Sequence, residues 1–521
     1  MAGTLCQQLV DGTLCGMMEE EVGVVGNTIV LMLGAGVLAS VLAMPLGLVL
    51  SKMPGRGSSI LAGLLTGMMF VPLYIQAGGW NAGFGALGWW TVTQAQASQN
   101  LFSGLWAVTW IHAFHAIPWC AWILAVGLTQ TSPSHEAQAM LDGGTSNVLF
   151  RVWLPNMIRW CCVSTLIVAC WISGDMVVTN LYRVPTLTEQ CYLDLSSGAD
   201  SSRAFYLSMI PPLLLTAALG ISFSRSSFTT DNAVRSSNPA LALSRSLLRS
   251  VWPIAILVAC FAIFAPLGNL VMKAGWDPIK DGDQIVHQWT LQQFAKSFLS
   301  VAEFTQEFYW TTMLVGFSTI ITLLCCVPTC YLAVRFPKVV LPAFAICLSL
   351  PGPIIAITVK RTFESLPPAL SSVLVEQTLC LPALALQFRT LPIAVTILYF
   401  LYQRWRSQYR SILELDGYSV PSRLKLFAVK HWGSLGGLML LILAIAMSEL
   451  SCYLLVLPAG VSPLSMRIFE LLHYGVRYKE AGLCLFLAIA GILLGYLAHR
   501  LFSFSSLKMS SRPARSSNAQ L

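Results

Sequence analysis

The sequence predicts an all-α protein that crosses a membrane many times. Apolar residues make up 56% of its 521 residues, and charged residues make up only 10%. Several apolar runs exceed the roughly 20 residues that a helix needs to cross about 30 Å of hydrocarbon. The net charge of +8 comes from short basic clusters between these runs, where such residues set membrane orientation. The expected surroundings are therefore a lipid bilayer and not nucleic acid.

Eleven apolar runs define the predicted spans. They lie at about 24–51, 59–79, 104–128, 157–179, 205–223, 252–272, 308–334, 339–360, 379–402, 433–457 and 480–502. The acidic segment before the first run lacks the basic start of a signal peptide. Most cysteines lie inside the runs, which predicts buried thiols and not disulfides.

The chain repeats itself, which predicts two homologous halves of five spans each. Four pairs of motifs recur in the same order and at a nearly constant separation. They are Asn27-Thr-Ile-Val with Trp310-Thr-Thr-Met, Phe70-Val-Pro72 with Ser349-Leu-Pro351, Leu141-Asp-Gly143 with Leu415-Asp-Gly417, and Gly174-Asp175 with Ser448-Glu449. The run at 252–272 has no counterpart in the first half, so we expect it to form one connecting helix.

The repeat and the basic residues together predict the organisation of the chain. The expected division is an extracytoplasmic N-terminus at 1–23, a first repeat at 24–223, a cytoplasmic linker at 224–250, an extra span with its outer loop at 251–307, a second repeat at 308–502 and a cytoplasmic tail at 503–521. Placing the segment 134–155 in the cytoplasm puts about twenty of the 31 basic residues on that side. The N-terminus should then face out and the C-terminus in.

The polar segment Ser134–Pro155, between two long apolar runs, says most about function. Thr131-Ser132-Pro133 favours a helix start, and Gly143-Gly144 permits a sharp reversal into a second short helix. The two helices would form a compact knob at the membrane surface. Either its apolar side chains anchor a partner, or they pack on the ends of the protein's own helices. These side chains are Val148, Leu149, Val152 and Trp153.

The pattern Glu136-Ala-x-Ala-x-x-Asp-Gly143, followed by Leu154-Pro155, resembles the cytoplasmic loop of the membrane subunits of ABC-type importers. In that family the loop docks on the ATPase, so the resemblance implies a partner that binds ATP and Mg²⁺ while this chain binds no cofactor. The sequence contains no Gly-rich phosphate loop of the Walker type. The implied docking residues are Glu136, Ala137, Ala139, Asp142, Gly143, Leu154 and Pro155.

The second copy of this segment departs from the pattern. Arg410 stands where the first copy has Glu136, and Val429 replaces Pro155. The turn motif is kept, and we expect the two loops to engage the ATPase unequally. The implied second docking loop comprises Arg410, Glu414, Leu415, Asp416 and Gly417.

Asp175 and Glu449 are acidic residues within predicted spans, near the outer ends of matched helices. An acidic side chain in a span usually faces an interior or a watery pathway, because exposure to lipid costs a few kcal/mol or more. The pair therefore predicts a shared central path for a cationic substrate. Alternatively, the two carboxylates support helix packing or pair with a base such as Arg389.

A run near the C-terminus, Arg467-Ile-x-x-Leu-Leu-His-Tyr-Gly475, resembles a segment of the fused, double-length permeases of ferric-iron importers. The resemblance implies an inner-membrane permease subunit that receives ferric iron from a periplasmic substrate-binding protein and works with two copies of an ABC ATPase. His473 and Tyr474 are expected to shape the docking surface and not to bind iron, because no ligand cluster of suitable spacing surrounds them.

Alternatives to iron import remain open at this point. The same machinery could move thiamine, a polyamine or another small solute, because related permeases share the loop. An ion-coupled secondary transporter with two repeats would need no ATPase, and broken helices or paired charges within the membrane would favour it. An enzyme would need a catalytic cluster, which the sequence lacks, so we predict a transporter subunit with no catalytic residues.

Overall fold

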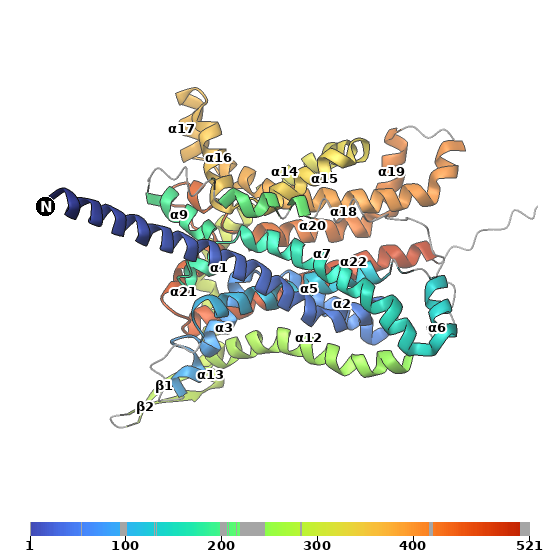
Figure 1. Ribbon diagram of the computed structural model, residues 1–521, viewed down its shortest axis with the longest axis horizontal. Coiled ribbons are helices and arrows are strands. Elements are labelled where there is room, and N and C mark those ends of the chain that lie inside the picture. The colour runs from blue at the N-terminus through green and yellow to red at the C-terminus, as the bar shows by residue number, and fades with distance from the viewer. Residues whose placement is uncertain are drawn as a thin grey trace, which may run out of the picture.

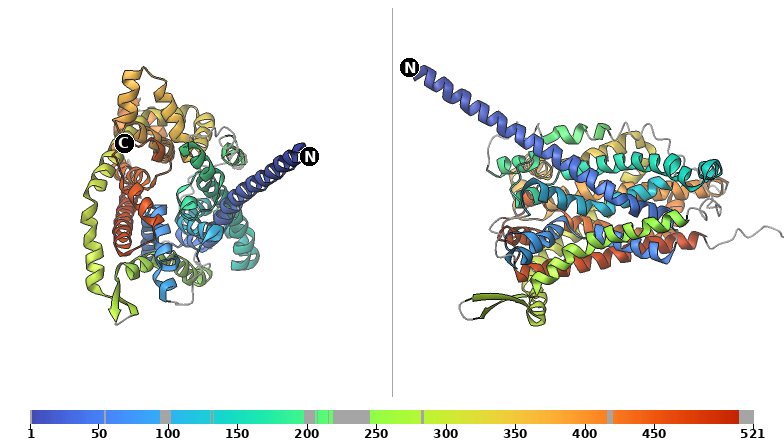
Figure 2. Two further views of the ribbon diagram at one scale, coloured as in Figure 1. Left: turned by 90° about the vertical axis from the view of Figure 1, so that its left-hand side faces the viewer. Right: turned by 60° about the horizontal axis from the view of Figure 1, so that its bottom comes forward.

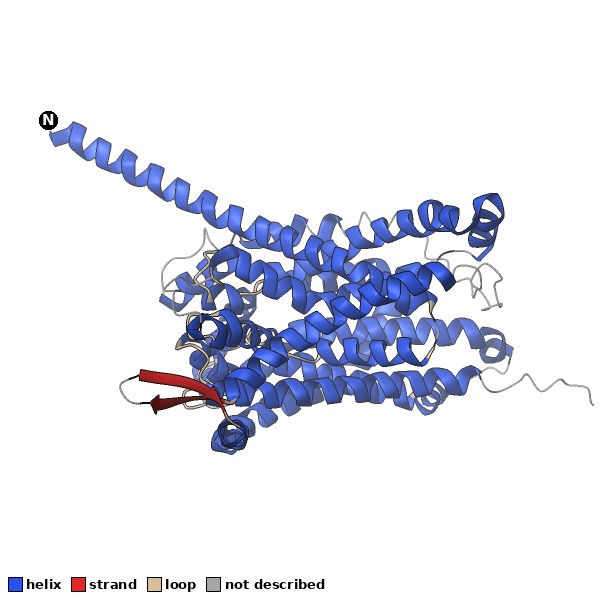
Figure 3. Ribbon diagram, turned by 90° about the horizontal axis from the view of Figure 1, so that it is seen from below, coloured by secondary structure: helices blue, strands red, loops and turns tan. Residues whose placement is uncertain are grey.

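The computed structural model describes residues 2–53, 55–93, 102–129, 131, 133–197, 206, 208–214, 216–218, 245–281, 284–415 and 420–510. Long helices dominate these ranges and run side by side in one bundle (Figure 1). One two-stranded antiparallel hairpin, with Trp276 paired to Trp289, projects from an end of the bundle (Figure 3).

The first half of the chain forms one series of helices. They are α1 (Ala2–Lys52), α2 (Arg56–Met69), α3 (Leu73–Phe84), α4 (Trp89–Thr93), α5 (Gly104–Leu128), α6 (Pro133–Asn147), the π-helix η1 (Val148–Trp153), α7 (Leu154–Ser173), α8 (Val177–Leu181) and α9 (Leu187–Ser197).

The second half begins with α12 and the hairpin. Its elements are α12 (Arg245–Ala274), β1 (Trp276–Asp281), β2 (Gln284–Trp289), α13 (Leu291–Leu299), η2 (Ser300–Phe304), α14 (Thr305–Arg335), α15 (Pro337–Ser349), α16 (Gly352–Glu364), α17 (Pro368–Glu376), α18 (Cys380–Leu415), α19 (Val420–Lys430), α20 (Trp432–Ser448), η3 (Leu454–Val456), α21 (Leu464–His473) and α22 (Tyr478–Ser510).

Within the described ranges, seven helices are long and apolar enough to cross a membrane, or up to nine if each of two bent helix pairs is one span. The pairs are Arg56–Met69 with Leu73–Val92, bent by 95°, and Pro337–Ser349 with Gly352–Glu364, bent by 106°. Shorter apolar helices at Ser208–Ala218 and Trp432–Ser448 fall in two further predicted runs. The all-α membrane class is confirmed, and the number eleven stays a prediction.

Both bent pairs break at prolines that the sequence matches to each other. Pro72 precedes α3 with φ −56° and ψ 147°, and Pro351 precedes α16 with φ −56° and ψ 135°. Proline lacks the N–H that a continuing helix needs, and it disfavours helical backbone in the residue before it. Each helix therefore ends ahead of its proline, and the next helix starts in a new direction.

Two hydrogen bonds recur at matched positions of the two halves. The Thr28 hydroxyl on α1 accepts from the Leu187 amide at 3.0 Å, and the Thr311 hydroxyl on α14 accepts from the Leu464 amide at 2.8 Å. Each hydroxyl also donates to the carbonyl four residues earlier, at 2.8 Å. The threonine thus fixes the start of α9 or α21 to the first long helix of its half.

The connecting helix α12 packs against the first half. The Phe261 ring lies 5.4 Å from the Phe114 ring, 5.9 Å from the Trp80 ring and 6.3 Å from the Trp110 ring. The Asn269 side chain accepts a hydrogen bond from the Trp89 indole at 3.2 Å. These contacts attach the start of the second half to the outer side of the first.

The two ends of the bundle carry different elements. α6 and α19 lie at one end, on the right in Figure 1, while α9, α21 and the β-hairpin lie at the other. α1 starts at Ala2, so the predicted N-terminal segment 1–23 belongs to the first helix, and it extends past the bundle at the α9 end (Figure 2).

We expect the two ends of the bundle to lie on opposite faces of the membrane. Cysteines introduced at Glu20 and Ser510 should react with an impermeant thiol reagent from opposite sides of sealed vesicles, because α1 starts at the α9 end and α22 runs to the α6 end (Figure 1). Labelling of both positions from the same side would contradict this orientation.

Candidate functional site

Asp175 and Glu449 each stand just beyond the end of a long helix. Asp175 follows α7, and its Oδ2 accepts from the Val178 amide at 3.2 Å. Glu449 follows α20, and its Oε1 accepts from the Cys452 amide at 3.2 Å. Both carboxylates therefore bind the backbone amide three residues later, as an N-terminal capping side chain does. The Ser451 hydroxyl also donates to Glu449, at 2.5 Å.

Each carboxylate has a basic partner on the matched helix of its own half. His112 Nε2 on α5 lies 3.5 Å from Asp175 Oδ2, and Arg389 Nε on α18 lies 3.5 Å from Glu449 Oε2. Both basic side chains are buried, whereas the acidic ones are 14% and 13% exposed. The structure therefore pairs Glu449 with Arg389, as the second of the two alternatives predicted.

The Arg389 guanidinium also caps the end of α15. It donates to the carbonyls of Leu348 and Leu350, the second at 2.8 Å. The last carbonyls of a helix have no partner within it and carry partial negative charge, so a cation there is stabilising. His112, on the matched helix α5, makes no hydrogen bond through Nε2 among the described residues. Each half thus pairs an acidic with a basic side chain, but the basic residue is a histidine in the first half and an arginine in the second.

The α15–α16 break lies against the end of α7 in the other half. The Gly352 amide donates to the Gly174 carbonyl at 3.4 Å, and the Ser173 hydroxyl donates to the Ser349 carbonyl at 3.5 Å. A side chain at Gly174 would place its Cβ 2.9 Å from Arg389 Nη2, so this position requires glycine for close approach. A further hydrogen bond joins the two halves, because the Tyr74 hydroxyl on α3 donates to the Met447 carbonyl of α20 at 3.2 Å.

A cavity of about 60 Å³ lies between the two carboxylates, which is enough for a few water molecules or a small ion. Helix α3, α5, α7 and the turn after α20 all contribute to its wall. The lining residues are Leu73, Tyr74, His112, His115, Ala116, Val168, Trp171, Ile172, Asp175, Val177, Ser448, Glu449 and Leu450. Asp175 and Glu449 both line this cavity, while a shared path for a substrate stays a prediction.

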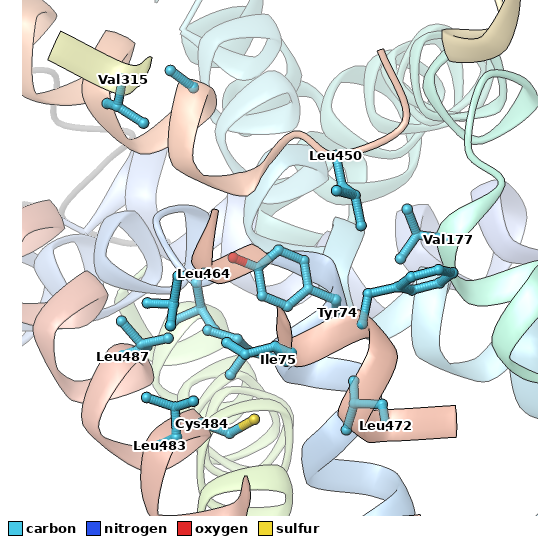
Figure 4. Close-up of a cluster of buried hydrophobic side chains, with 14 of the residues drawn as sticks. Tyr74, Ile75, Val177, Val315, Leu450, Leu464, Leu472, Leu483, Cys484 and Leu487 are labelled. Carbon is cyan, nitrogen blue, oxygen red and sulfur yellow. The ribbon is translucent and has the colours of Figure 1, made fainter. Parts of the chain in front are cut away.

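Apolar packing closes the cavity on one side. Tyr74, Val177 and Leu450 line the cavity and also belong to a buried cluster with Leu464 and Leu472 of α21 (Figure 4). The cluster draws on both halves of the chain. A solute larger than the cavity could pass only if these helices moved apart.

The first knob is held by a buried ion pair. Glu136 on α6 is 3% exposed, and its Oε1 receives hydrogen bonds from the Lys52 ammonium, the Thr131 hydroxyl at 2.7 Å and the Trp153 indole at 3.1 Å. Lys52 is the last residue of α1 and also donates to Thr131 at 2.8 Å. Glu136 therefore fixes the knob to the bundle and cannot itself touch a docked partner.

Burial separates the knob's internal residues from its surface. Ala139, Val148 and Trp153 are at most 8% exposed and pack on Leu48 and Leu128 of the bundle. Ala137 and Leu154 are half-buried, while Asp142, Gly143 and Pro155 are exposed. Of the two alternatives, Val148 and Trp153 therefore pack on the protein's own helices.

Two large apolar side chains outside the predicted docking set are exposed on the surface of the knob. Leu141 is 88% exposed and Phe150 is 62% exposed. Leu141 lies directly before Asp142 in the repeated Leu-Asp-Gly motif, so that motif was the available signal. These two residues are the best candidates to contact a partner at this end of the bundle.

The reversal in the knob depends on Gly144. Its φ of 71° and ψ of −157° lie in a region that only glycine adopts readily, and the preceding Gly143 is also non-helical, with φ −179° and ψ 25°. We expect Gly144→Ala to cost about 1–3 kcal/mol of local stability and to increase protease cleavage of the α6 hairpin. Gln138→Ala, an exposed change on the same helix, is the control and should have little effect. Equal cleavage of the two variants would contradict this assignment.

The second knob is built differently. Helix α18 continues to Leu415, so Arg410, Glu414 and Leu415 are helical, while Asp416 and Gly417 lie outside the described residues. Trp405 is fully buried and packs against Phe427 of α19 with ring centroids 5.5 Å apart. Phe427 also stacks on His431 at 4.7 Å. Aromatic packing here takes the place of the Lys52–Glu136 pair.

His473 joins the two halves at the α9 end. Its Nε2 lies 3.0 Å from Asn180 Oδ1 on α8, and its Nδ1 lies 2.8 Å from the Phe469 carbonyl. Asn180 in turn donates to Glu189 at 3.3 Å, and burial raises the pKa of the Glu189 carboxyl. Neither ring nitrogen is free for a metal ion. Among the described residues, no three His, Cys, Asp or Glu side chains are placed to hold one.

Comparison of the chain with protein-family models, with curated proteins and with solved structures gives no match.

Proposed function

We propose that this chain is the membrane permease of a binding-protein-dependent ABC importer, with both permease halves in one polypeptide. The observation that carries the proposal is a cavity at the junction of the halves, to which each half contributes an acidic side chain, Asp175 or Glu449. In secondary transporters built from repeats, ligand sites lie at such junctions near helix breaks, so the cavity supports a transport role.

The matched contacts support two homologous halves. Thr28 and Thr311 make the same pair of hydrogen bonds. Asp175 and Glu449 each accept a hydrogen bond from the backbone amide three residues later. Both knobs lie at one end of the bundle, as two ATPase copies docked side by side would require (Figure 1). ATP-driven closure of those copies would move the knobs and open the path alternately to each side.

The outer end of the bundle suits delivery of substrate by a periplasmic binding protein. In this proposal α9, α21 and the N-terminus face the periplasm, and the knobs, the linker and the C-terminus face the cytoplasm of an inner membrane. The acidic Asp175 at the cavity favours a cationic substrate. Ferric iron is the cation that the resemblance of Arg467–Gly475 implies.

The exposed Leu141 and Phe150 provide the test of the docking step. Leu141→Asp and Phe150→Asp should each lower the amount of ATPase that co-purifies with the tagged chain at least about tenfold, because a charge buried in an interface is costly. Leu193→Asp on α9, where the side chain is 42% exposed at the opposite end, is the control and should retain the ATPase. If no ATPase accompanies the unmodified chain, the importer proposal fails.

One set of observations favours a second candidate, an ion-coupled secondary transporter. The bent pairs at Pro72 and Pro351 and the buried Arg389–Glu449 pair are both typical of that class. Uptake into sealed vesicles distinguishes the candidates. An importer requires ATP and the ATPase, whereas a secondary transporter responds to an imposed ion gradient without either.

A further inference from the structure

The two carboxylates of the cavity have partners of unlike charge. Glu449 faces the Arg389 guanidinium, which is charged at every physiological pH, and also accepts from Ser451. Asp175 faces His112, whose imidazole is charged only when protonated. Glu449 is therefore neutralised within the fold. Asp175 is the carboxylate that remains available to a cation in the cavity.

Two imidazole nitrogens near Asp175 make no hydrogen bond among the described residues, although one of them, His112 Nε2, lies 3.5 Å from the Asp175 carboxylate. His112 is 3% exposed, and its Nε2 makes no hydrogen bond among the described residues. The same is true of Nδ1 of His115, one turn further along α5. Both side chains line the cavity, and a buried polar atom without a partner costs free energy. A ligand that brought N–H donors into the cavity would remove that cost.

An aromatic side chain lies beside these two nitrogen atoms. Trp171 on α7 lines the cavity and packs edge-to-face with Trp119 at 4.8 Å and with His115 at 6.0 Å. Its ring is held in place by those contacts. Indole faces attract cations, and the attraction grows when the site is shielded from water.

We propose that the cavity binds the ammonium group of an organic amine, with Asp175 as its counter-ion, His112 and His115 as hydrogen-bond acceptors and Trp171 as its aromatic wall. This inference rests on the proposed transport function and replaces ferric iron by a primary amine as the substrate class. Ferric iron prefers a cluster of oxygen donors. The described residues place no three metal-binding side chains together, and the free groups around Asp175 are imidazole and indole.

The role of Glu449 follows from the same geometry. Through Arg389 it holds the end of α15 against Gly174 of the first half, so it is a positioning residue and does not bind the amine. The two carboxylates thus have different roles: Asp175 of the first half binds the ligand, and Glu449 of the second half stabilises the helix end that lies against the cavity.

The test is ligand binding to the purified full-length chain in lipid nanodiscs, followed by thermal unfolding and tryptophan fluorescence. The probes are propylamine, 1,4-diaminobutane, tetramethylammonium, propanol and ferric citrate at equal ionic strength. The two primary amines should raise the unfolding temperature in a saturable way. Tetramethylammonium lacks N–H donors and propanol lacks charge, so neither should do so.

Variants assign the binding to the cavity. Asp175→Asn should weaken binding of 1,4-diaminobutane at least tenfold, and Trp171→Leu should weaken it about tenfold. His112→Ala is a second variant, in case Asp175→Asn does not fold, and it should also lose about tenfold. Lys360→Gln, an exposed change on α16 whose side chain is 38% accessible, is the control.

The outcomes separate the amine from the iron. Binding of ferric citrate that depends on Asp175, without binding of amines, would overturn the proposal, and so would the absence of any probe effect that depends on Asp175. Because the assay contains no ATPase and no ATP, its failure leaves the importer proposal standing. Loss of ATPase co-purification, conversely, leaves an amine-binding result intact.

Discussion

Glu136→Gln is expected to destabilise the folded chain by about 3–5 kcal/mol, because it leaves the Lys52 ammonium buried without a counter-charge. The two side chains are 4% and 8% exposed and lie where α1 ends against α6. Thr131 and Trp153 donate to the same oxygen, which the glutamine amide retains as an acceptor, so the change removes chiefly the negative charge. The measurement is the free energy of unfolding in mixed micelles.

Two further variants show whether the charge is responsible. Replacing both partners, as Lys52→Met with Glu136→Leu, should recover much of the stability, because apolar residues of similar volume often replace a buried pair at little cost. Arg335→Met removes the matched basic residue of the second half. It should have little effect, because that side chain is exposed and packs only against the Phe336 ring at 5.6 Å among the contacts described. An unchanged unfolding free energy for Glu136→Gln would contradict the role assigned to the pair.

The class of fold could be predicted from the sequence because hydrocarbon thickness fixes helix length. The runs at 104–128 and 252–272 correspond to helices Gly104–Leu128 and Arg249–Ala274, which shows how closely apolar length follows the span. The breaks at Pro72 and Pro351 were harder to predict. A proline after an apolar run predicts a helix end, but not whether the chain turns back into the bundle or leaves it.

The direction of side chains in the knob was not predictable from its motif. Glu136, Ala139 and Leu141 all lie in one short helix, and only tertiary contact with Lys52 and the ends of α1 and α5 decides which of them is buried. An exposed leucine beside a buried glutamate reverses the usual pattern of polarity. This reversal at a helix end is itself a sign of a docking surface.

The shared cavity was predictable in part. Asp175 and Glu449 stood out because charges in spans are rare, and the repeat placed them on matched helices. Their basic partners carried a weaker signal, because the 274 residues that separate Asp175 from Glu449 also separate His115, and not His112, from Arg389. The differing roles of the two pairs depend on the α15 carbonyls, which no sequence pattern reports.

Arg389→Met is expected to cost about 3–5 kcal/mol of stability and to reduce the amount of folded protein in the membrane, because it leaves Glu449 as an unpaired buried carboxylate. The variant also removes the donors to the Leu348 and Leu350 carbonyls at the end of α15. Both losses weaken the contact between the α15–α16 break and Gly174 of the first half. Folded protein is measured by fluorescence-detected size exclusion and stability by thermal unfolding.

His112→Gln is the matched change in the first half, and it should cost less, about 1–3 kcal/mol at most, because the imidazole caps no helix end among the described residues. The double variant Arg389→Met with Glu449→Gln separates the two losses. It removes the unpaired charge but not the missing carbonyl contacts, so it should recover only part of the stability. Full recovery would mean that the charge alone matters and that capping of α15 does not. Equal costs for Arg389→Met and His112→Gln would contradict the division between a bracing half and a ligand-binding half, because that division requires the guanidinium to hold the helix break as well as the carboxylate.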